Sequence, residues 1–332
     1  MSSGTRKTIQ SIDKFLFKYH LWRFIIHILR STLHNIRLWH RGFFRLSSSN
    51  SRALFPEIVL SPESAGLSPN QMDDWRQNGF LILPGFFSFV EIESVNSEVD
   101  CFWQSSRHNL SELTVDIFLD ERGQRVKLHD APIEARSRPY KLNDIFLSSS
   151  VVRDLILENR LRKILNVLLG GEPLVCNTLN LEFGSQQDFH TDSLYMTPPK
   201  DLNLIATWIA LEDCFSEAGP LQYYPGSHKI PPYVFSSGQI TSIDSEMDEY
   251  RNYMNAEIKR RALVSNSFCA KKGDLFIWHS QLFHGGSKIL NPTLTRKSIV
   301  THYFKRVDLS CEVAVSEAGG FYMMRQHQST MH

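Results

Sequence analysis

The sequence predicts an α+β domain in which helices pack on one face of an antiparallel sandwich or barrel. Helix start and stop signals dominate the chain as far as Gly170-Gly171, and short apolar or alternating runs separated by turn residues follow from Pro173 onward. The 332 residues are 42% hydrophobic and 21% charged. This composition is typical of a globular protein with a sizeable core.

The first 45 residues have the pattern of a basic amphipathic helix. Apolar residues recur every three or four positions between Ile9 and Ile36, and nine Lys or Arg residues stand against the single acid Asp13, a net charge of +8. Such a helix can lie on an anionic membrane, serve as an organelle transit peptide, or dock on the domain or a partner subunit. A linker at Leu46–Asn50 follows, and the extension ends at residue 56. We expect a cytoplasmic protein, with peripheral membrane contact through residues 1–45 as an alternative.

Charge and cysteine content narrow the classes of function. Beyond Arg45 the chain carries a net charge of −7, so nucleic acid is not expected as a substrate. The five cysteines are scattered and contain no C-x-x-C pair, which argues against a disulfide framework or a thiolate zinc site and favours a reducing compartment. No apolar stretch of the sequence approaches the ~20 residues that span a bilayer.

The first half of the chain contains clear start and stop signals for helices. Ser68 and Pro69 predict the start of a helix that Gly79 ends, and Phe80–Leu83 follows as a short buried strand. Ser88 and Glu91 form a capping-box pattern that opens a second helix to about residue 104. The third predicted helix is the strongest and runs from residue 149 or 150 to the glycine pair at 170–171.

The second half of the chain predicts strands with one long insertion. The strand-like runs are Leu174–Phe183, Phe189–Leu194, Leu202–Leu211, Leu221–Tyr224, Asp274–His279 and Lys297–Phe304. Between them, Pro231–Arg261 is polar, partly helical and rich in Ser, Asp and Glu. In a barrel enzyme an insertion of this length commonly covers the mouth of the active site, so we expect a lid there.

A metal-binding pattern lies in one of these runs. In His190-Thr191-Asp192 the imidazole and the carboxylate stand at positions i and i+2 of a strand, so both project to one face and can meet one ion. His284 supplies the third ligand. Two histidines and one carboxylate leave open positions on the metal, which is the arrangement of non-haem Fe(II) oxygenases. The open positions can take 2-oxoglutarate and O2.

Arg296 points to 2-oxoglutarate in particular. It lies twelve residues after His284, in a strand-like run where it shares one face with Ser298, Val300 and His302. If that face points inward, the guanidinium needs an anionic partner, and the distal carboxylate of 2-oxoglutarate satisfies it bidentately. The alternative is a solvent-exposed arginine on an edge strand.

Further motifs extend this pattern over most of the chain. They are Leu67-Ser68, Asn78-Gly79-Phe80-Leu81-Ile82-Leu83-Pro84-Gly85-Phe86, Gly219-Pro220-Leu221, Pro225-Gly226-Ser227-His228, Gly273-Asp274 and His279. With the metal pattern, they make the chain resemble the phytanoyl-CoA dioxygenase family over roughly residues 57–308; residues 1–56 and the tail 309–332 fall outside the resemblance. It implies a double-stranded β-helix (jelly-roll or cupin-like) barrel with supporting helices, and an Fe(II)/2-oxoglutarate-dependent oxygenase.

The resemblance also assigns site residues. It places Fe(II) on His190, Asp192 and His284, and the co-substrate 2-oxoglutarate beside Arg296, Lys141 and Trp208. Lys141 could instead be a solvated lysine at a helix edge, and Trp208 ordinary core. The sequence departs from the family where two glycines follow His284, because a Ser or Thr hydroxyl often helps to hold the co-substrate there; Ser287 is the candidate replacement.

Other side chains compete for these roles. His279 is the alternative third ligand, but twelve residues suit a strand–turn–strand connection to Arg296 better than seventeen, and His284 matches the family position. We expect His228 to fix a turn, and His302 either to face the substrate or to be a core histidine. The side chains that either shape a substrate pocket or belong to the core are Tyr195, Met196, Tyr223 and Trp278.

The predicted reaction is hydroxylation of a C–H bond in a small organic or lipid-like molecule, with release of succinate and CO2. Asp192 favours hydroxylation over halogenation, because a small residue there would open a halide site. The same site could desaturate or epimerise. Two other classes stay open: a catalytically inactive barrel that binds or scaffolds, and a metal-dependent cupin-type hydrolase or isomerase, which would not need Arg296 inside. Members of the family act on acyl-CoA thioesters, compatible solutes and secondary metabolites, so its name does not identify the substrate.

Overall fold

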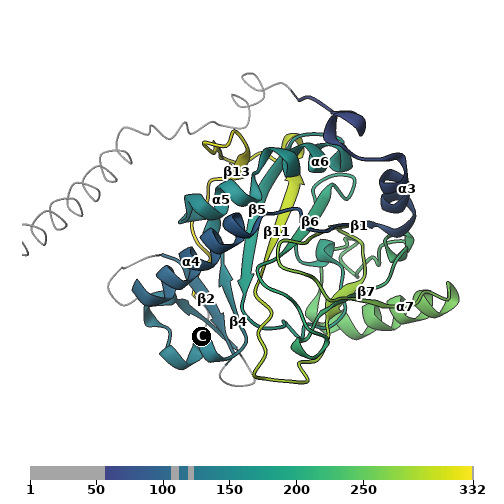
Figure 1. Cartoon of the computed structure of the whole chain (residues 1–332). Coiled ribbons are helices and arrows are strands. Elements are labelled where there is room, and N and C mark those ends of the chain that lie inside the picture. Colours follow the sequence, from purple (N-terminus) through teal and green to yellow (C-terminus); the bar gives the residue numbers. More distant parts are fainter. Residues whose placement is uncertain (1–56, 106–111, 119–122, 331–332) are drawn as a thin grey trace, which may run out of the picture. The chain divides into compact units, whose positions relative to one another are not determined.

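The computed structural model describes residues 57–105, 112–118 and 123–330 (Figure 1). The predicted helix of residues 1–45 and its linker lie outside the described residues. The α-helices are α3 (Pro69–Asn78), α4 (Phe89–Ser105), α5 (Ser150–Ile156), α6 (Asn159–Leu169) and α7 (Met247–Arg260). The strands are β1 (Phe80–Leu83), β2 (Thr114–Ile117), β3 (Gln124–Lys127), β4 (Tyr140–Asn143), β5 (Pro173–Leu181), β6 (Leu204–Ala210), β7 (Leu221–Tyr223), β8 (Asn266–Phe268), β9 (Leu275–His279), β10 (His284–Gly286), β11 (Ser298–Lys305), β12 (Val313–Val315) and β13 (Phe321–Met323).

The strands form two sheets. The large sheet has the order β1-β9-β6-β11-β5-β4-β2-β3, and the small sheet has the order β10-β7-β8. Pairing is antiparallel apart from β13, which runs parallel to β5 and antiparallel to β12. The last strand, β13, therefore belongs to the large sheet. The α+β prediction is confirmed, but within the described residues the strand pairing does not close the sheets into the predicted barrel.

Side chains alternate between two faces of the large sheet. On β6, Ile205 and Ile209 pack with residues of α3 to α6 in the main core, whereas Trp208 packs with the small sheet through Leu221 and Phe268. The period of two along each strand thus separates a helix-covered face from a face that looks toward the small sheet. Figure 1 shows α4, α5 and α6 lying along the helix-covered face. The site described below lies between the two sheets.

The predicted start and stop signals of the first helices are confirmed. Ser68 accepts a hydrogen bond from the backbone N–H of Gln71, whose side chain accepts one from the N–H of Ser68, and Gly79 ends α3 in the left-handed conformation at φ 78°. Gly79 also needs to be glycine for space, because a Cβ there would meet the His228 ring. α4 begins after Ser88 and ends at Ser105, one residue beyond the predicted end.

Two local predictions are wrong. The predicted single helix from residue 149 to residue 170 is broken into α5 and α6, because Leu157 leaves the helical conformation and the Glu158 carboxylate accepts a hydrogen bond from the N–H of Leu161 as the N-cap of α6. The run Phe189–Leu194 is not a strand. His190 makes an isolated bridge to His284, and the chain then turns into a 3₁₀ helix at Asp192–Leu194.

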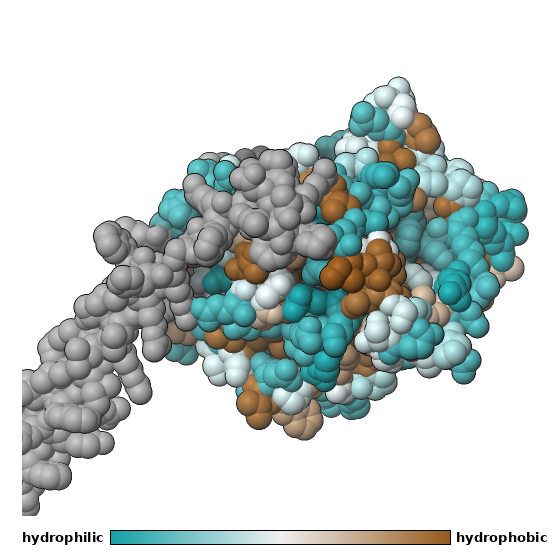
Figure 2. All heavy atoms as spheres, turned by 90° about the horizontal axis from the view of Figure 1, so that it is seen from above, coloured by the Kyte–Doolittle hydropathy of each residue, from teal (hydrophilic) through white to brown (hydrophobic). Residues whose placement is uncertain are grey.

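Among the described residues, each helix falls short of the length and apolar character that a bilayer crossing needs. Figure 2 shows a face on which several groups of hydrophobic residues lie separated by hydrophilic ones. Scattered exposed apolar side chains such as Ile58, Val90 and Leu290 are normal for a globular domain.

Candidate functional site

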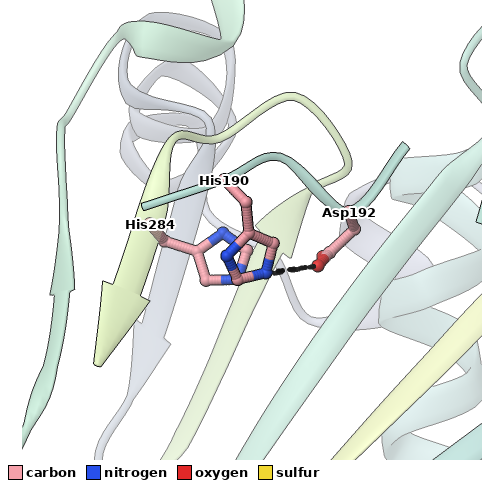
Figure 3. A group of neighbouring side chains, drawn as sticks. All are labelled: His190, Asp192 and His284. Atoms are coloured by element: carbon pink, nitrogen blue, oxygen red, sulfur yellow. Dashed lines mark ion pairs between the residues drawn. The ribbon is translucent and has the colours of Figure 1, made fainter. Parts of the chain in front are cut away.

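Three buried side chains converge between the two sheets. His190, Asp192 and His284 offer ligand atoms that all lie within 4.8 Å of one another, and Figure 3 shows both imidazoles and the carboxylate turned toward one another. His190 and His284 are held together by two backbone hydrogen bonds of 2.8 and 3.0 Å between their own N–H and C=O groups. The 3₁₀ turn then brings Asp192 back beside them. His190 and Asp192 are therefore positioned by a single bridge and a turn, and not by the predicted strand.

Each histidine is oriented by a backbone carbonyl. Nδ1 of His190 donates to the carbonyl of Asp188 at 2.8 Å, and Nδ1 of His284 donates to the carbonyl of Leu282 at 2.9 Å. Because Nδ1 carries the hydrogen in both rings, Nε2 presents its lone pair. The two Nε2 atoms lie 3.7 and 3.6 Å from Oδ1 of Asp192. Carbonyl-oriented imidazoles of this kind are typical of metal ligands.

Burial and neighbouring charges shift the pKa values of His190 and Asp192. Burial, and then the neighbouring His284, lower the pKa of His190 to about 3. Burial alone would raise the pKa of Asp192, but the imidazoles of His284 and His302 outweigh it and hold that pKa below its ordinary value. Neutral imidazoles and an ionised carboxylate are the forms that bind a metal ion.

Arg296 lies in the same cavity, which has a volume of about 380 Å³. It is 3% exposed, and its Nη1 donates to the carbonyl of Gly219 at 2.8 Å. Its Nε has no hydrogen-bond partner, and no ion pair joins it to an acidic residue within the described part of the chain. Burial lowers the pKa of Arg296 to about 10. A buried guanidinium without an acid is costly unless an anion enters the cavity.

The two other predicted co-substrate residues also line this cavity. Trp208 is buried on β6, and the guanidinium carbon of Arg296 lies 5.7 Å from its ring centroid. Lys141 is on β4, not at a helix edge, and burial lowers its pKa. Its Nζ lies 6.0 Å from the ring of Phe118. Ser287 does not line the cavity, because its hydroxyl donates to the carbonyl of Pro220.

The structure separates the competing histidines. His279 lies away from the three ligands, between the rings of Trp75 and His228, and its Nδ1 accepts a hydrogen bond from the N–H of Gln281. His302, by contrast, faces the cavity on β11, and its Nε2 lies 3.6 Å from Oδ1 of Asp192. Of its two sequence interpretations, the structure shows the inward-facing one.

The side chains around the triad were only partly accessible to sequence reasoning. Trp278 donates through Nε1 to Oδ2 of Asp192 at 2.7 Å, and Tyr195 and Met196 also line the cavity. Tyr223 packs in the core between the sheets. The cavity-lining polar residues that the sequence did not single out are Asp116, Arg125, Asn143, Asn177, Ser185, Gln187 and Gln328. They come from β2 to β5, from the loop after β5 and from the C-terminal segment, where no local motif marks them.

The insertion at residues 231–261 packs against the segments that carry Asp192 and His284. On α7, Tyr250 and Met254 cluster with Leu194 and Phe283, the neighbours of Asp192 and His284 in sequence. The hydroxyl of Tyr250 lies 3.5 Å from Oγ1 of Thr191. Among the described residues that line the cavity, none comes from this insertion. Its visible contribution is to support the backbone that carries two of the three ligands.

Comparison with known proteins identifies relatives of the chain. A family model described as "Phytanoyl-CoA dioxygenase (PhyH)" matches residues 75–298. Phytanoyl-CoA dioxygenase domain-containing protein 1 of Mus musculus is 24% identical over 257 residues, which cover 66% of this chain and 84% of that protein. The same protein of Bos taurus is 24% identical over 193 residues, 49% of this chain and 66% of the relative. The match thus spans just under two thirds of the bovine protein.

Solved structures share the fold. The α-ketoglutarate-dependent carbocyclase SnoK from nogalamycin biosynthesis superposes with a TM-score of 0.55 at 17% identity, over 73% of this chain and 86% of that chain. EctD from S. alaskensis, solved with 2-oxoglutarate and 5-hydroxyectoine, superposes with a TM-score of 0.52 at 17% identity, over 79% of this chain and 87% of that chain. At these identities the likeness concerns the cupin-like fold alone.

Proposed function

The chain belongs to the phytanoyl-CoA dioxygenase family, and from this premise we propose that it is an Fe(II)- and 2-oxoglutarate-dependent dioxygenase that hydroxylates a C–H bond of a small polar molecule. The proposal includes the double-stranded β-helix architecture, with the large and small sheets as its two halves. It also assigns Fe(II) to His190, Asp192 and His284.

The observation that carries the proposal is the position of Arg296 relative to the three ligands. A buried guanidinium with a free Nε and no acidic partner among the described residues lines the cavity into which two imidazoles and a carboxylate point. A dicarboxylic acid fits both features, because one end can reach the metal and the other can pair with Arg296. A cupin-type hydrolase or isomerase would have no use for this arginine.

The protein's own residues prepare the site for that chemistry. When bound, iron and 2-oxoglutarate supply the oxidation, in which 2-oxoglutarate and O2 are converted to succinate and CO2 while the substrate gains a hydroxyl group. The carbonyls of Asp188 and Leu282 aim the imidazoles, and Trp278 holds one oxygen of Asp192. Trp208, Leu221 and Val300 line the cavity with apolar surface, which disfavours water in it.

The cavity supports a small and polar substrate. Its volume of about 380 Å³ has to hold the co-substrate as well. Beyond the metal ligands, the large sheet turns a row of charged and amide side chains toward it: Asp116, Arg125, Lys141, Asn143 and Asn177. Arg125 and Asn143 bond to Asp116, and Asn177 bonds to Asp144, so these side chains form a polar surface that suits a polar ligand better than an acyl chain. We therefore favour a polar metabolite over the lipid-like substrate that the basic N-terminal segment had suggested.

The test is Fe(II)-dependent formation of succinate from 2-oxoglutarate across a panel of small polar metabolites. His284→Ala, Asp192→Ala and Arg296→Ala are expected to reduce turnover to background, whereas replacement of the partly buried His279 at the end of β9, in His279→Gln, should retain it. If the wild-type protein neither binds Fe(II) nor turns over 2-oxoglutarate under any of these conditions, the chain is a non-catalytic member of the family. Turnover by all three alanine variants would contradict the assignment of the site.

A further inference from the structure

We propose that His302 is a positioning residue of the metal site, and that a chain of hydrogen bonds from the C-terminal segment, residues 324–330, holds it in place. The chain runs from Arg325 through Asp144 and Asn177 to His302, whose ring lies against Asp192. The inference rests on the proposed metal site. The two residues of this hydrogen-bond chain that lie outside the cavity, Asp144 and Arg325, were not predicted as site residues from the sequence. The inference makes residues 324–330 part of the site.

The first link is the contact between His302 and Asp192. Nε2 of His302 lies 3.6 Å from Oδ1 of Asp192, the same separation as that of His284. The other oxygen of this carboxylate is already fixed by Trp278. His302 is not one of the three residues whose ligand atoms converge. At 3.6 Å the His302 ring packs beside Oδ1 without a hydrogen bond to it, and this contact limits where the oxygen can move.

The second link fixes the orientation of the His302 ring. Its Nδ1 lies 3.1 Å from Oδ1 of Asn177, the residue directly opposite on β5. The amide of Asn177 is oriented by Asp144, because its Nδ2 donates at 3.1 Å to Oδ1 of Asp144, an oxygen that also accepts a hydrogen bond from the backbone N–H of Thr178. Oδ1 of Asn177 therefore faces His302, and Nδ1 of His302 is the donor. Both side chains are buried, at 8% and 6% exposure.

The third link ties Asp144 to the C-terminal segment. Asp144 is completely buried and adopts a left-handed backbone conformation at φ 55°. Nη2 of Arg325 donates to its Oδ2 at 2.6 Å, and Nε2 of Gln328 donates to the same oxygen at 3.2 Å. A buried carboxylate requires such partners. Gln328 also lines the cavity, so the same segment supplies part of its wall.

A β-bulge in β5 provides a second binding point for Arg325. Along β5, Asn177 pairs with His302 and Val175 with Tyr303, so Cys176 is the extra residue. Its carbonyl is bound by Nε and Nη2 of Arg325 at 3.3 and 3.2 Å. Bulges beside active sites commonly re-aim a side chain. Here Arg325 binds both the bulge and Asp144. The bulge lies directly beside the pair formed by Asn177 and His302.

The experiment compares Co(II) affinity, measured by visible absorption titration with the metal alone, in wild type, Arg325→Met, His302→Gln and the double variant. We expect His302→Gln to weaken binding by roughly tenfold, because the ring that packs against the ligand carboxylate is lost. Arg325→Met should weaken it several-fold in the wild-type background and by less than about two-fold in the His302→Gln background, because both act through one chain. Arg325→Lys, which keeps a charge for Asp144, should restore much of the affinity.

The matched control is Arg162→Met. Arg162 also binds the C-terminal part of the chain, through the carbonyls of Ala318 and Gly319, but it has no contact with Asp144. We expect it to leave Co(II) affinity within two-fold. Independent effects of Arg325→Met and His302→Gln that multiply in the double variant would overturn the inference, as would an unchanged affinity in Arg325→Met.

A second measurement does not need the metal. In ¹H–¹⁵N spectra of the histidine rings, the Nδ1–H signal that disappears in His302→Gln should shift or broaden in Arg325→Met and stay in place in Arg162→Met. If wild type fails to bind Co(II) at all, the proposed metal site fails, and this signal alone decides whether the C-terminal segment orients His302. If wild type binds Co(II) and the signal does not respond to Arg325→Met, only the inference fails.

Discussion

The indole of Trp278 fixes one oxygen of the Asp192 carboxylate, with Nε1 donating to Oδ2 at 2.7 Å in a fully buried setting. Because Oδ2 is engaged, Oδ1 is the oxygen left facing the Nε2 atoms of His190 and His284. The carboxylate is thus oriented for one-oxygen contact with a metal ion. This partner lies 86 residues further along the chain, on β9, so the ligand depends on the large sheet as well as on its own turn.

Trp278→Phe is expected to weaken Co(II) binding by about 10- to 100-fold, since the ring stays but the donor to Asp192 is lost. The loss of a charge-assisted hydrogen bond should also lower the free energy of unfolding by roughly 1.5 to 3 kcal/mol. Metal titration and urea denaturation measure the two effects. Trp208→Phe is the matched control, because the Nε1 of Trp208 has no hydrogen-bond partner. Equal metal affinity in Trp278→Phe and wild type would show that this bond does not orient the ligand.

Arg296→Met is expected to have opposite effects on stability and on co-substrate binding. Burial lowers the pKa of Arg296 to about 10 from 12.5, so at neutral pH the folded protein holds a charge that the unfolded chain holds more easily. Removing it should raise the free energy of unfolding of the ligand-free protein by about 1 kcal/mol or more. The cost of burying this charge should shrink as the pH rises above 10, where the folded state loses the proton first, so the stability difference between Arg296→Met and wild type should narrow there.

The same variant should bind 2-oxoglutarate at least about 30-fold more weakly, measured by calorimetry on Co(II)-loaded protein, because a buried carboxylate loses its charge partner. Arg136→Met serves as the control. Arg136 pairs with Asp100 and Glu182 outside the cavity, so its loss should destabilise the fold and leave 2-oxoglutarate binding unchanged. Unaltered 2-oxoglutarate affinity in Arg296→Met would remove the basis for the proposed co-substrate.

How far the sequence predicts this site depends on how local each signal is. The period of two along β11 correctly places Val300 and His302 on the cavity side, and capping residues correctly begin α3 and α4. These features depend on neighbours within a few residues. The order of the motifs also brings Arg296 and the three ligands into one cavity.

The missed features are long-range. Asp144 and Arg325 are 181 residues apart, and no pattern near either residue announces the other. β2 and β4 are four residues each, too short for their alternation to be recognised in sequence, yet they carry Asp116 and Lys141 to the cavity. The strand predicted around His190 failed for a related reason. One bridge to His284 suffices to place it, and periodicity cannot reveal a single bridge.

Acid should destabilise the fold partly through His279. Burial, and then the neighbouring His228, lower the pKa of His279 to about 4 from 6.5. Between these values the unfolded chain binds a proton that the folded protein does not, so stability is complete above pH 6.5 and falls as the pH drops toward 4. The contribution is about 1 to 3 kcal/mol. Urea denaturation at pH 7 and pH 4.5 measures it, and His279→Gln should lose less stability over this range than wild type does.

The two glycines after His284 explain why a hydroxyl residue does not stand there. A Cβ on Gly285 would lie 2.9 Å from the carbonyl oxygen of Gln187 and 3.1 Å from the N–H nitrogen of Phe189, both backbone atoms of the segment that leads to His190. At Gly286 a Cβ would lie 2.7 Å from the backbone nitrogen of Gln186. The close approach of these two segments is what allows the bridge between His190 and His284.

Gly285→Ala should therefore push the His190 segment away from β10 and separate two of the three ligands. We expect Co(II) affinity to fall by at least about tenfold, as for displacement of a ligand's support, and the melting temperature to fall as well. Ser287→Ala is the control, because it lies on the same connection and loses only a hydrogen bond to Pro220. Wild-type metal affinity in Gly285→Ala would mean that the segment can shift without moving His190, and that the bridge does not set the geometry of the site.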